Sequence, residues 1–277
     1  MNLERARGRG QVVAITVLIV LLAGCTTIRD ARGGPGQRLD PWEKWNRKVF
    51  NFNEDVDKAV LVPVATAYTN VVPQSVRRGV GNFFGNFADA WSAINNLLQG
   101  KFKAGFEDAT RVGANTLFGL LGILDVASEM GLEHHYEDFG QTLGHYGIGA
   151  GAYIVLPVLG PSTVRDAAAI PINRVASPPG FFDEISAQVG LTALQIINTR
   201  AGLLGATRVI DEISLDKYTF VRDAYLQRRR SLVFDGDAPE TPAEPERAAP
   251  AAAGAAAGNL APPAAATPAS APASAPR

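Results

Sequence analysis

The sequence DPWEKWNRKVFNFNEDVDKAV, residues 40–60, decides the fold because its apolar residues recur at the spacing of one helical face. Asp40, Pro41 and Glu43 form a helix start, with a capping carboxylate, a proline at the first helical position and an acid at the third. Pro63 follows, and we predict that the helix ends there. This pattern predicts an amphipathic helix. Its apolar face consists of Trp42, Trp45, Val49, Phe52, Val56 and Val60.

The two tryptophans leave two interpretations of this helix open. An amphipathic helix can pack its apolar face on the core of a soluble domain, or it can lie in a membrane interface. Trp42 and Trp45 stand near the start of the mature chain, and tryptophan is enriched where a membrane meets water. The pair therefore favours the interfacial position, with the soluble core helix as the alternative.

A second amphipathic helix is expected from about Pro73, and its polar face is mostly neutral. Asparagine, serine and glutamine dominate that face, where soluble helices usually carry charges. Gly81 and Gly85 are spaced for close contact with another helix. The apolar stripe consists of Val76, Val80, Phe83, Phe84, Phe87, Trp91, Ile94, Leu97 and Leu98.

Four further helices complete a predicted all-α fold. In the first of them we expect the apolar residues to point inward. Residues 143–151 hold too many glycines for a stable helix interior, so we expect a loop there. The four helices are expected at about 101–118, 162–170, 183–210 and 214–231. The inward residues of the first are Phe102, Phe106, Ala109, Val112 and Leu117.

Residues 1–24 have the layout of a secretory signal peptide. Three arginines precede an apolar run over residues 12–22, which is shorter than the ~20 residues that a spanning helix needs. Leu22-Ala23-Gly24-Cys25 is typical of a bacterial lipobox, in which the cysteine is lipidated and becomes the new N-terminus. A plain signal peptide with an incidental cysteine is the alternative. By resemblance to envelope lipoproteins, Thr26 in the position where an aspartate would signal retention implies sorting to the outer membrane.

Composition divides the chain into four parts. We predict a lipoprotein signal peptide at 1–24, a lipidated N-terminus and linker at 25–39, a helical domain at 40–235 and a disordered Ala/Pro-rich tail at 236–277. The formal net charge of −1 gives no electrostatic case for nucleic acid as a partner. No mature segment reaches ~18 uninterrupted apolar residues, so we expect no ordinary transmembrane span.

The histidines give little support for catalysis or metal binding. His134 and His135 are adjacent, which does not suit a shared ligand set on a helix, and no zinc-protease motif or cysteine ligand accompanies them. His145 lies in the glycine-rich segment without a visible partner for a general base. We therefore predict no catalytic residue, no metal site and no cofactor. Arg228, Arg229 and Arg230 form either a solvated helix end or a contact for lipid phosphate.

These features together resemble the MlaA (VacJ) family of outer-membrane lipoproteins over about residues 40–231. The matching segments are long and follow one another in order along the chain. Ala152 stands where the family often has proline. The segments are Asp40-Pro41-x-Glu43, Asn46-Arg47-x-x-Phe50-Asn51-Phe52-Asn53, Val72-Pro73-Gln74, Leu98-Gln99-Gly100, Gly122-Ile123-Leu124-Asp125-Val126-Ala127, Phe139-Gly140-x-Thr142-Leu143-Gly144 and Leu156-Pro157 through Arg165-Asp166.

The resemblance implies a ring-like bundle of amphipathic helices embedded in one membrane leaflet, beside porin trimers of the outer membrane. It implies a non-enzymatic protein that removes glycerophospholipids from the outer leaflet and passes them to a periplasmic MlaC-like carrier. An inner-membrane ABC transporter then receives them. Within the matching segments, polar or glycine-rich positions are our candidates for the lipid path. They are Asn51, Phe52, Asn53, Gly147, Gly149, Arg165 and Asp166.

Two other functions remain open from the sequence. One is an envelope scaffold whose tail reaches peptidoglycan, a porin or another protein. The other is a phospholipid-modifying enzyme that uses His145.

Overall fold

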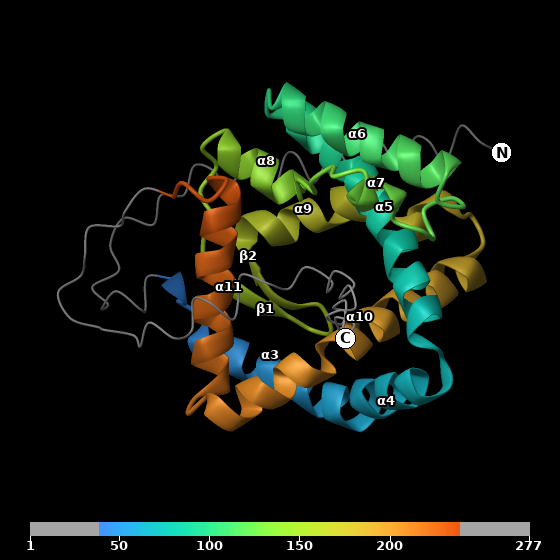
Figure 1. Ribbon diagram of the computed structural model, residues 1–277. Coiled ribbons are helices and arrows are strands. Elements are labelled where there is room, and N and C mark those ends of the chain that lie inside the picture. The colour runs from blue at the N-terminus through green and yellow to red at the C-terminus, as the bar shows by residue number, and fades with distance from the viewer. Residues whose placement is uncertain (1–38, 239–277) are drawn as a thin grey trace, which may run out of the picture. The chain divides into compact units, whose positions relative to one another are not determined.

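The computed structural model describes residues 39–238 (Figure 1). The expected signal peptide, the Cys25 anchor and the tail beyond residue 238 lie outside the described residues. Contacts divide the chain into the units Met1–Pro239 and Glu240–Arg277, and every described residue belongs to the first.

The described residues are mainly helical, which confirms the predicted fold class, and the four later helices form close to their expected positions. One β-hairpin and several short helices were not predicted from the sequence. The elements are α3 (Glu43–Val56), the π-helix η1 (Asp57–Leu61), α4 (Val62–Val71), α5 (Gln74–Leu98), α6 (Phe102–Leu117), α7 (Val126–Glu129), α8 (Phe139–His145), β1 (Tyr153–Leu156), β2 (Gly160–Thr163), α9 (Val164–Val175), the 3-10 helix η2 (Pro178–Phe181), α10 (Ile185–Ile213) and α11 (Lys217–Val233).

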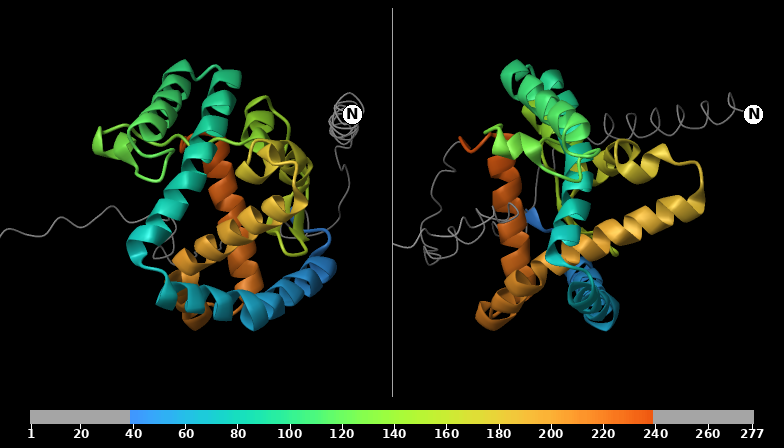
Figure 2. Two further views of the ribbon diagram at one scale, coloured as in Figure 1. Left: turned by 90° about the vertical axis from the view of Figure 1, so that its right-hand side faces the viewer. Right: turned by 45° about the vertical axis from the view of Figure 1, so that its right-hand side comes forward.

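The helices of this unit follow one another around its edge. In Figure 1, α3 and α4 run along the bottom, α5 forms the right side, α6, α8 and α9 lie at the top, and α11 forms the left side. Helix α10 packs against both α4 and α5. The two views of Figure 2 show η2 and the start of α10 reaching away from the plane of the other helices. None of the helices within residues 39–238 combines the length and apolar character needed to cross a membrane.

The first predicted helix forms, but both of its predicted ends are wrong. Trp42 occupies the N-cap position, and Asp40 instead accepts hydrogen bonds from Asn46 Nδ2 (2.8 Å) and from the Tyr218 hydroxyl. At the other end the chain continues through η1 into α4. Pro63 lies in the first turn of α4, directly after the π-helical turn in which Val62 N donates to the Asp57 carbonyl, so the chain passes the proline without leaving the helical conformation.

The pairing of α5 with α6 reverses the expected orientation of α6. Phe102, Phe106 and Leu117 are 62%, 66% and 78% exposed, so the prediction that they point inward is wrong. The buried face of α6 instead carries Asp108 and Arg111. These side chains form hydrogen bonds and ion pairs with α5 and the segment after α6, so the apolar face turns outward.

Close contacts between helices also differ from the predicted glycine pair. A side chain at Gly85 would meet nothing within 4 Å, and one at Gly81 would make only ordinary contact with Asn198. The tight approach occurs at Gly105 of α6, where a Cβ atom would lie 3.2 Å from the Ala93 carbonyl oxygen of α5 and closer still to Leu97. Gly105 therefore lets the two helices pack closely.

A small apolar core joins α3, the hairpin and α11. Tyr153 pairs with Thr163 and Leu156 with Gly160 in the antiparallel hairpin. Asn46 of α3 is fully buried and binds the hairpin backbone twice: its Nδ2 donates to the Tyr153 carbonyl (3.1 Å), and its Oδ1 accepts from Val155 N (2.9 Å). The core residues are Val49, Phe50, Tyr153, Val155 and Tyr218.

Replacement of Asn46 should therefore weaken the whole unit. Asn46→Ala leaves Val155 N and the Tyr153 carbonyl buried without partners, which costs about 2–3 kcal/mol and lowers the Tm by roughly 5–10 °C. Thermal unfolding in detergent measures the shift. Asn51→Ala, an exposed asparagine on the same helix, is the matched control and should change the Tm little. Equal Tm values for the two variants would contradict the assigned role.

Candidate functional site

The exterior of residues 39–238 carries many large apolar side chains. Trp45 is 59% exposed on α3, Phe106 is 66% exposed on α6, and Phe181 is 67% exposed in η2. Among the described residues, fully buried polar side chains outnumber fully buried apolar ones. Large exposed apolar surface marks contact with protein or membrane. This distribution suits a protein whose helices are surrounded by lipid on their outer faces.

Arg111 forms the centre of the polar interior between α5, α6 and the segment that follows them. Its side chain is fully buried. It donates from Nε to Asp89 Oδ2 (3.1 Å), from Nη1 to the Leu132 carbonyl (2.5 Å) and from Nη2 to Asp125 Oδ1 (3.0 Å). His134 Nε2 lies 2.7 Å from Nη2, and His134 Nδ1 lies 2.8 Å from Asp89 Oδ1. These contacts suit a neutral His134 that accepts from arginine and donates to aspartate.

A second set of hydrogen bonds extends this interior toward α8. Asp108 accepts from Asn96 Nδ2 (2.9 Å) and from His135 N (3.1 Å). Burial raises the pKa of the Asp108 carboxyl to about 6, although the His135 hydrogen bond opposes the shift. His134 and His135 thus lie in a segment without regular secondary structure and contact two different aspartates, Asp89 and Asp108. In the described part of the chain, no group of three or more His, Cys, Asp or Glu side chains could hold a metal ion.

Arg229 ties α8, α9 and α11 together. It donates to both carboxylate oxygens of Asp138 (2.6 Å each) and from Nε to Asp166 Oδ2 (2.8 Å). Arg165 Nε donates to Asp166 Oδ1 (2.9 Å). Burial alone would raise the pKa of Asp166, but the hydrogen bonds and charges of Arg229 and Arg165 outweigh it and hold the pKa below its ordinary value. Arg229 is therefore neither a solvated helix end nor free to bind lipid phosphate.

The candidates on α3 have different surroundings. Asn51 and Phe52 are exposed. Asn53 is half-buried and holds the hairpin turn, because its Nδ2 donates to the Leu156 carbonyl (2.9 Å) and its Oδ1 accepts from Val158 N (2.8 Å). Asn53 positions the hairpin relative to α3.

The other candidates lie together around the end of α8. Helix α8 extends to His145, so the loop expected from residue 143 begins only at Tyr146. Gly147 and Gly149 are exposed in this loop, and Arg165 Nη1 donates to the Ile148 carbonyl between them (3.3 Å). Arg165 and Asp166 are buried. Arg165 thus joins the glycine loop to the Arg229 cluster; a role of these residues in a lipid path stays a prediction.

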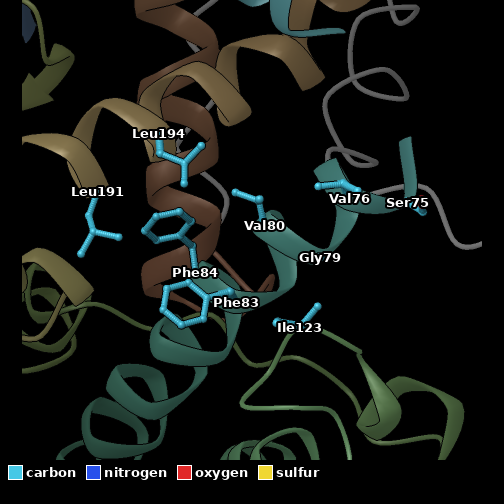
Figure 3. Close-up of a pocket in the computed structure, with 9 residues that line it drawn as sticks. All are labelled: Ser75, Val76, Gly79, Val80, Phe83, Phe84, Ile123, Leu191 and Leu194. Carbon is cyan, nitrogen blue, oxygen red and sulfur yellow. The ribbon is translucent and has the colours of Figure 1, made fainter. Parts of the chain in front are cut away.

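An apolar cavity of about 450 Å³ lies between α5, α10 and the loop after α6 (Figure 3). Leu191 and Leu194 extend from α10 toward the two phenylalanines of α5. The large apolar residues of α5 that line the cavity belong to the apolar stripe predicted for this helix. No pattern in the sequence predicts that α10 and Ile123 form the other walls. The lining residues are Ser75, Val76, Gly79, Val80, Phe83, Phe84, Ile123, Leu191 and Leu194.

The loop over residues 118–124 forms one wall of the cavity and has a strained backbone. Leu120 and Leu121 have φ values of 53° and 59°, in the left-handed region that non-glycine residues rarely adopt. Such residues each cost roughly 1–3 kcal/mol and persist only when surrounding contacts hold them. Asn82 Nδ2 donates to the Ile123 carbonyl (3.0 Å), and Gly122 N donates to the Asn115 carbonyl (2.8 Å).

A mostly helical unit with a polar interior and an apolar exterior defines a class of protein suited to contact with lipid. The chain belongs to the MlaA lipoprotein family, whose match spans residues 38–232. A similar protein of Escherichia coli (strain K12), the "Intermembrane phospholipid transport system lipoprotein MlaA", is 36% identical over 81% of this chain and 89% of its own length. A protein of the same description from Haemophilus influenzae is 32% identical over 80% of this chain and 90% of its own length.

A solved structure supports the same family at the level of the fold. It concerns the "Structural basis for maintenance of bacterial outer membrane lipid asymmetry". The two chains are 35% identical and superpose with a TM-score of 0.63, and the match covers 70% of this chain and 98% of the solved one.

Acid should weaken the fold through Asp166. Because its pKa is lowered in the folded state, its contribution to stability is complete above about pH 4 and is lost as the pH falls through the lowered value. Asp166→Asn should therefore lower the Tm at neutral pH, and the difference from wild type should shrink below about pH 4. Thermal unfolding in detergent across this range tests it.

The control for this prediction is Asp223→Asn, which alters an exposed partner of Arg222. Its Tm difference from wild type should stay small at every pH, because exposed ion pairs contribute little. A difference between wild type and Asp166→Asn that is the same in acid and at neutral pH would contradict the electrostatic role.

Proposed function

We propose that this protein removes mislocalised glycerophospholipids from the outer leaflet of the outer membrane and passes them to a periplasmic carrier. This activity would maintain the lipid asymmetry of that membrane. The observation that carries the proposal is the reversed polarity of the helical unit, in a chain that belongs to the MlaA lipoprotein family.

The energetics of moving a phospholipid explain why reversed polarity is useful. Exposing an acyl chain of ~16 carbons to water costs on the order of 13 kcal/mol, at ~0.8 kcal/mol per CH₂. A protein that moves such a lipid must cover its chains and solvate its headgroup. Apolar outer faces around a hydrogen-bonded polar interior provide both environments within one unit.

The candidate sites support a transport protein without catalysis. His145, the general base of the enzymatic alternative, is exposed at the end of α8 and contacts the Tyr146 ring edge-on. A histidine base is normally oriented by a third group. Within residues 39–238, no such acidic partner of His145 is found among the hydrogen bonds and ion pairs.

The cellular position and partners follow from the family resemblance. We propose that Cys25 is lipidated and that the exposed apolar faces place the unit in the periplasmic leaflet of the outer membrane. The partners implied are porin trimers in that membrane, an MlaC-like lipid carrier in the periplasm and, indirectly, an inner-membrane ABC transporter. The exposed apolar faces of the helices agree with a protein that lies in one leaflet.

Surface phospholipid in a strain that lacks this protein tests the function. We expect the deletion strain to accumulate phospholipid that reacts with a membrane-impermeant amine reagent, and the wild-type copy to reverse this. A copy without residues 237–277 and a His145→Ala copy should also reverse it, because neither the tail nor a histidine base is needed for transport. No accumulation in the deletion strain would refute the proposal.

Two outcomes would favour the alternatives. Failure of the copy without residues 237–277, with normal protein levels, would favour the envelope scaffold. Phospholipid hydrolysis by the purified protein that disappears in His145→Ala would favour the enzyme.

Membrane association without the lipid anchor tests the position of the unit. Cys25→Ala, exported with a cleavable soluble signal, should still fractionate with outer membranes because the apolar faces bind lipid. Phe102→Glu with Phe106→Glu in that background should release it, whereas Lys103→Glu, an exposed position on the same helix, should not. Recovery of the Cys25→Ala protein wholly in the soluble periplasmic fraction would contradict an embedded unit.

A further inference from the structure

We infer that the cavity between α5, α10 and the 118–124 loop binds one acyl chain of a phospholipid. The inference rests on the proposed function. It states where in the protein an acyl chain is shielded from water during transport. The cavity has a volume of about 450 Å³. Apolar protein cavities of about 150 Å³ stay dry and bind molecules of the size of benzene, so this one has room for a longer hydrocarbon.

The lining selects for hydrocarbon. Ser75 is the sole residue with a polar side chain among the lining residues that the structure describes. Leu191 and Leu194 of α10 face Phe83 and Phe84 of α5 across the space (Figure 3). A charged headgroup placed here would lose its hydration without gaining hydrogen bonds. An acyl chain carries no such cost and gains from burial.

The cavity opens toward the apolar exterior, which gives a lipid chain a route into it. Val76 and Ile123 line the cavity and are also 52% and 46% exposed. Leu120 and Leu121, next to Ile123 in the loop, are each 67% exposed. A chain in the surrounding lipid can therefore enter along a continuous apolar surface while its headgroup stays outside.

Glycine at position 79 sets how closely the loop covers the cavity. A Cβ atom at Gly79 would lie 2.9 Å from Ile123 Cγ2, so glycine is what lets Ile123 approach α5. Asn82, one turn further along α5, donates to the Ile123 carbonyl (3.0 Å). The loop wall is thus attached to α5 by specific contacts, and the cavity has a defined width.

The chain's own tail is a poor occupant. Residues 239–277 contain Leu260 as their one large aliphatic residue and no aromatic residue. Alanine and proline, which dominate the tail, bury little apolar area and would leave most of the space empty. A lipid chain fits the volume and the apolar lining of the cavity better.

Photolabelling tests the inference. The full-length protein is placed in nanodiscs with a phosphatidylethanolamine that carries a diazirine halfway along one acyl chain, and labelled residues are mapped by mass spectrometry. We expect labels at the cavity segments of α5 and α10. Leu194→Trp fills the cavity and should lower this labelling about tenfold, which corresponds to the loss of roughly two buried CH₂ groups. Val80→Trp fills the cavity from the α5 side and should lower the labelling in the same way. It replaces Leu194→Trp as the test if that variant does not fold.

Matched variants separate filling from general damage. Ile94→Trp adds the same side chain to an exposed position of α5 outside the cavity lining and should leave the labelling unchanged. Leu194→Ala enlarges the space and should retain it. Labelling spread evenly over the exposed apolar residues, or unaffected by both filling variants, would overturn the inference. Labelling of the cavity by a free diazirine fatty acid but not by the phospholipid would also overturn it.

The cellular assay distinguishes this inference from the proposed function. If the function is right and the cavity binds a chain, Leu194→Trp should fail to clear surface phospholipid while Ile94→Trp succeeds. If wild type and Leu194→Trp clear surface phospholipid equally, the cavity does not bind the chain during transport, and the proposed transport function is unaffected. If wild type does not affect surface phospholipid, the function itself falls.

Discussion

The buried charge of Arg111 is the constraint on which the rest of the unit depends. An arginine without water must have nearby anions and a full set of acceptors, and removing one partner of such a pair costs 3–5 kcal/mol in typical cases. Its partners come from three places: Asp89 on α5, Asp125 before α7, and the Leu132 carbonyl. The helical hairpin and the segment after it must therefore pack together before the charge is satisfied.

The orientation of α6 follows from that requirement. Phe102 lies nine residues before Arg111, or two and a half helical turns, which places it on the opposite side of the helix. With Arg111 directed inward, Phe102 must face outward, where it is 62% exposed. In water this arrangement would be unfavourable, because apolar area is left exposed while charges are buried. In lipid the exposed apolar area costs nothing, because lipid tails are as apolar as a protein core, and charges are better placed in the hydrogen-bonded interior than in the lipid. The lipid surroundings that we propose would therefore favour the observed orientation of α6.

The outward orientation of the apolar face of α6 also shows which features could be predicted from the sequence. Helical periodicity located the long helices, and the mature chain motifs indicated the family, because both signals are local in sequence. Periodicity cannot say which face of a helix is buried, so the apolar face of α6 was wrongly assigned to the interior. The sequence context of Asp40 predicts a helix cap, but in the fold its carboxylate accepts hydrogen bonds from Asn46 and Tyr218 and is buried. Contacts between distant segments, such as those of Leu194 and Ile123 with α5, leave no local signal.

The polar interior around Arg111 and the apolar cavity beside α5 are stabilised by different kinds of interaction. The polar interior is fastened by charged hydrogen bonds, which act over short distances and lose strength quickly when atoms move. Contacts within the apolar cavity depend on area and are nearly independent of direction, so its side chains can adjust to a ligand of variable shape. A lipid chain that slides must be held in this second way, since directional bonds would stop it at one position. In the binding that we propose, the network around Arg111 keeps α5 in place while the apolar side chains that line the cavity adjust to the acyl chain. Helix α5 therefore needs directional bonds on its polar face, which fix its position, and non-directional contacts on its apolar face, which fit a chain of variable shape.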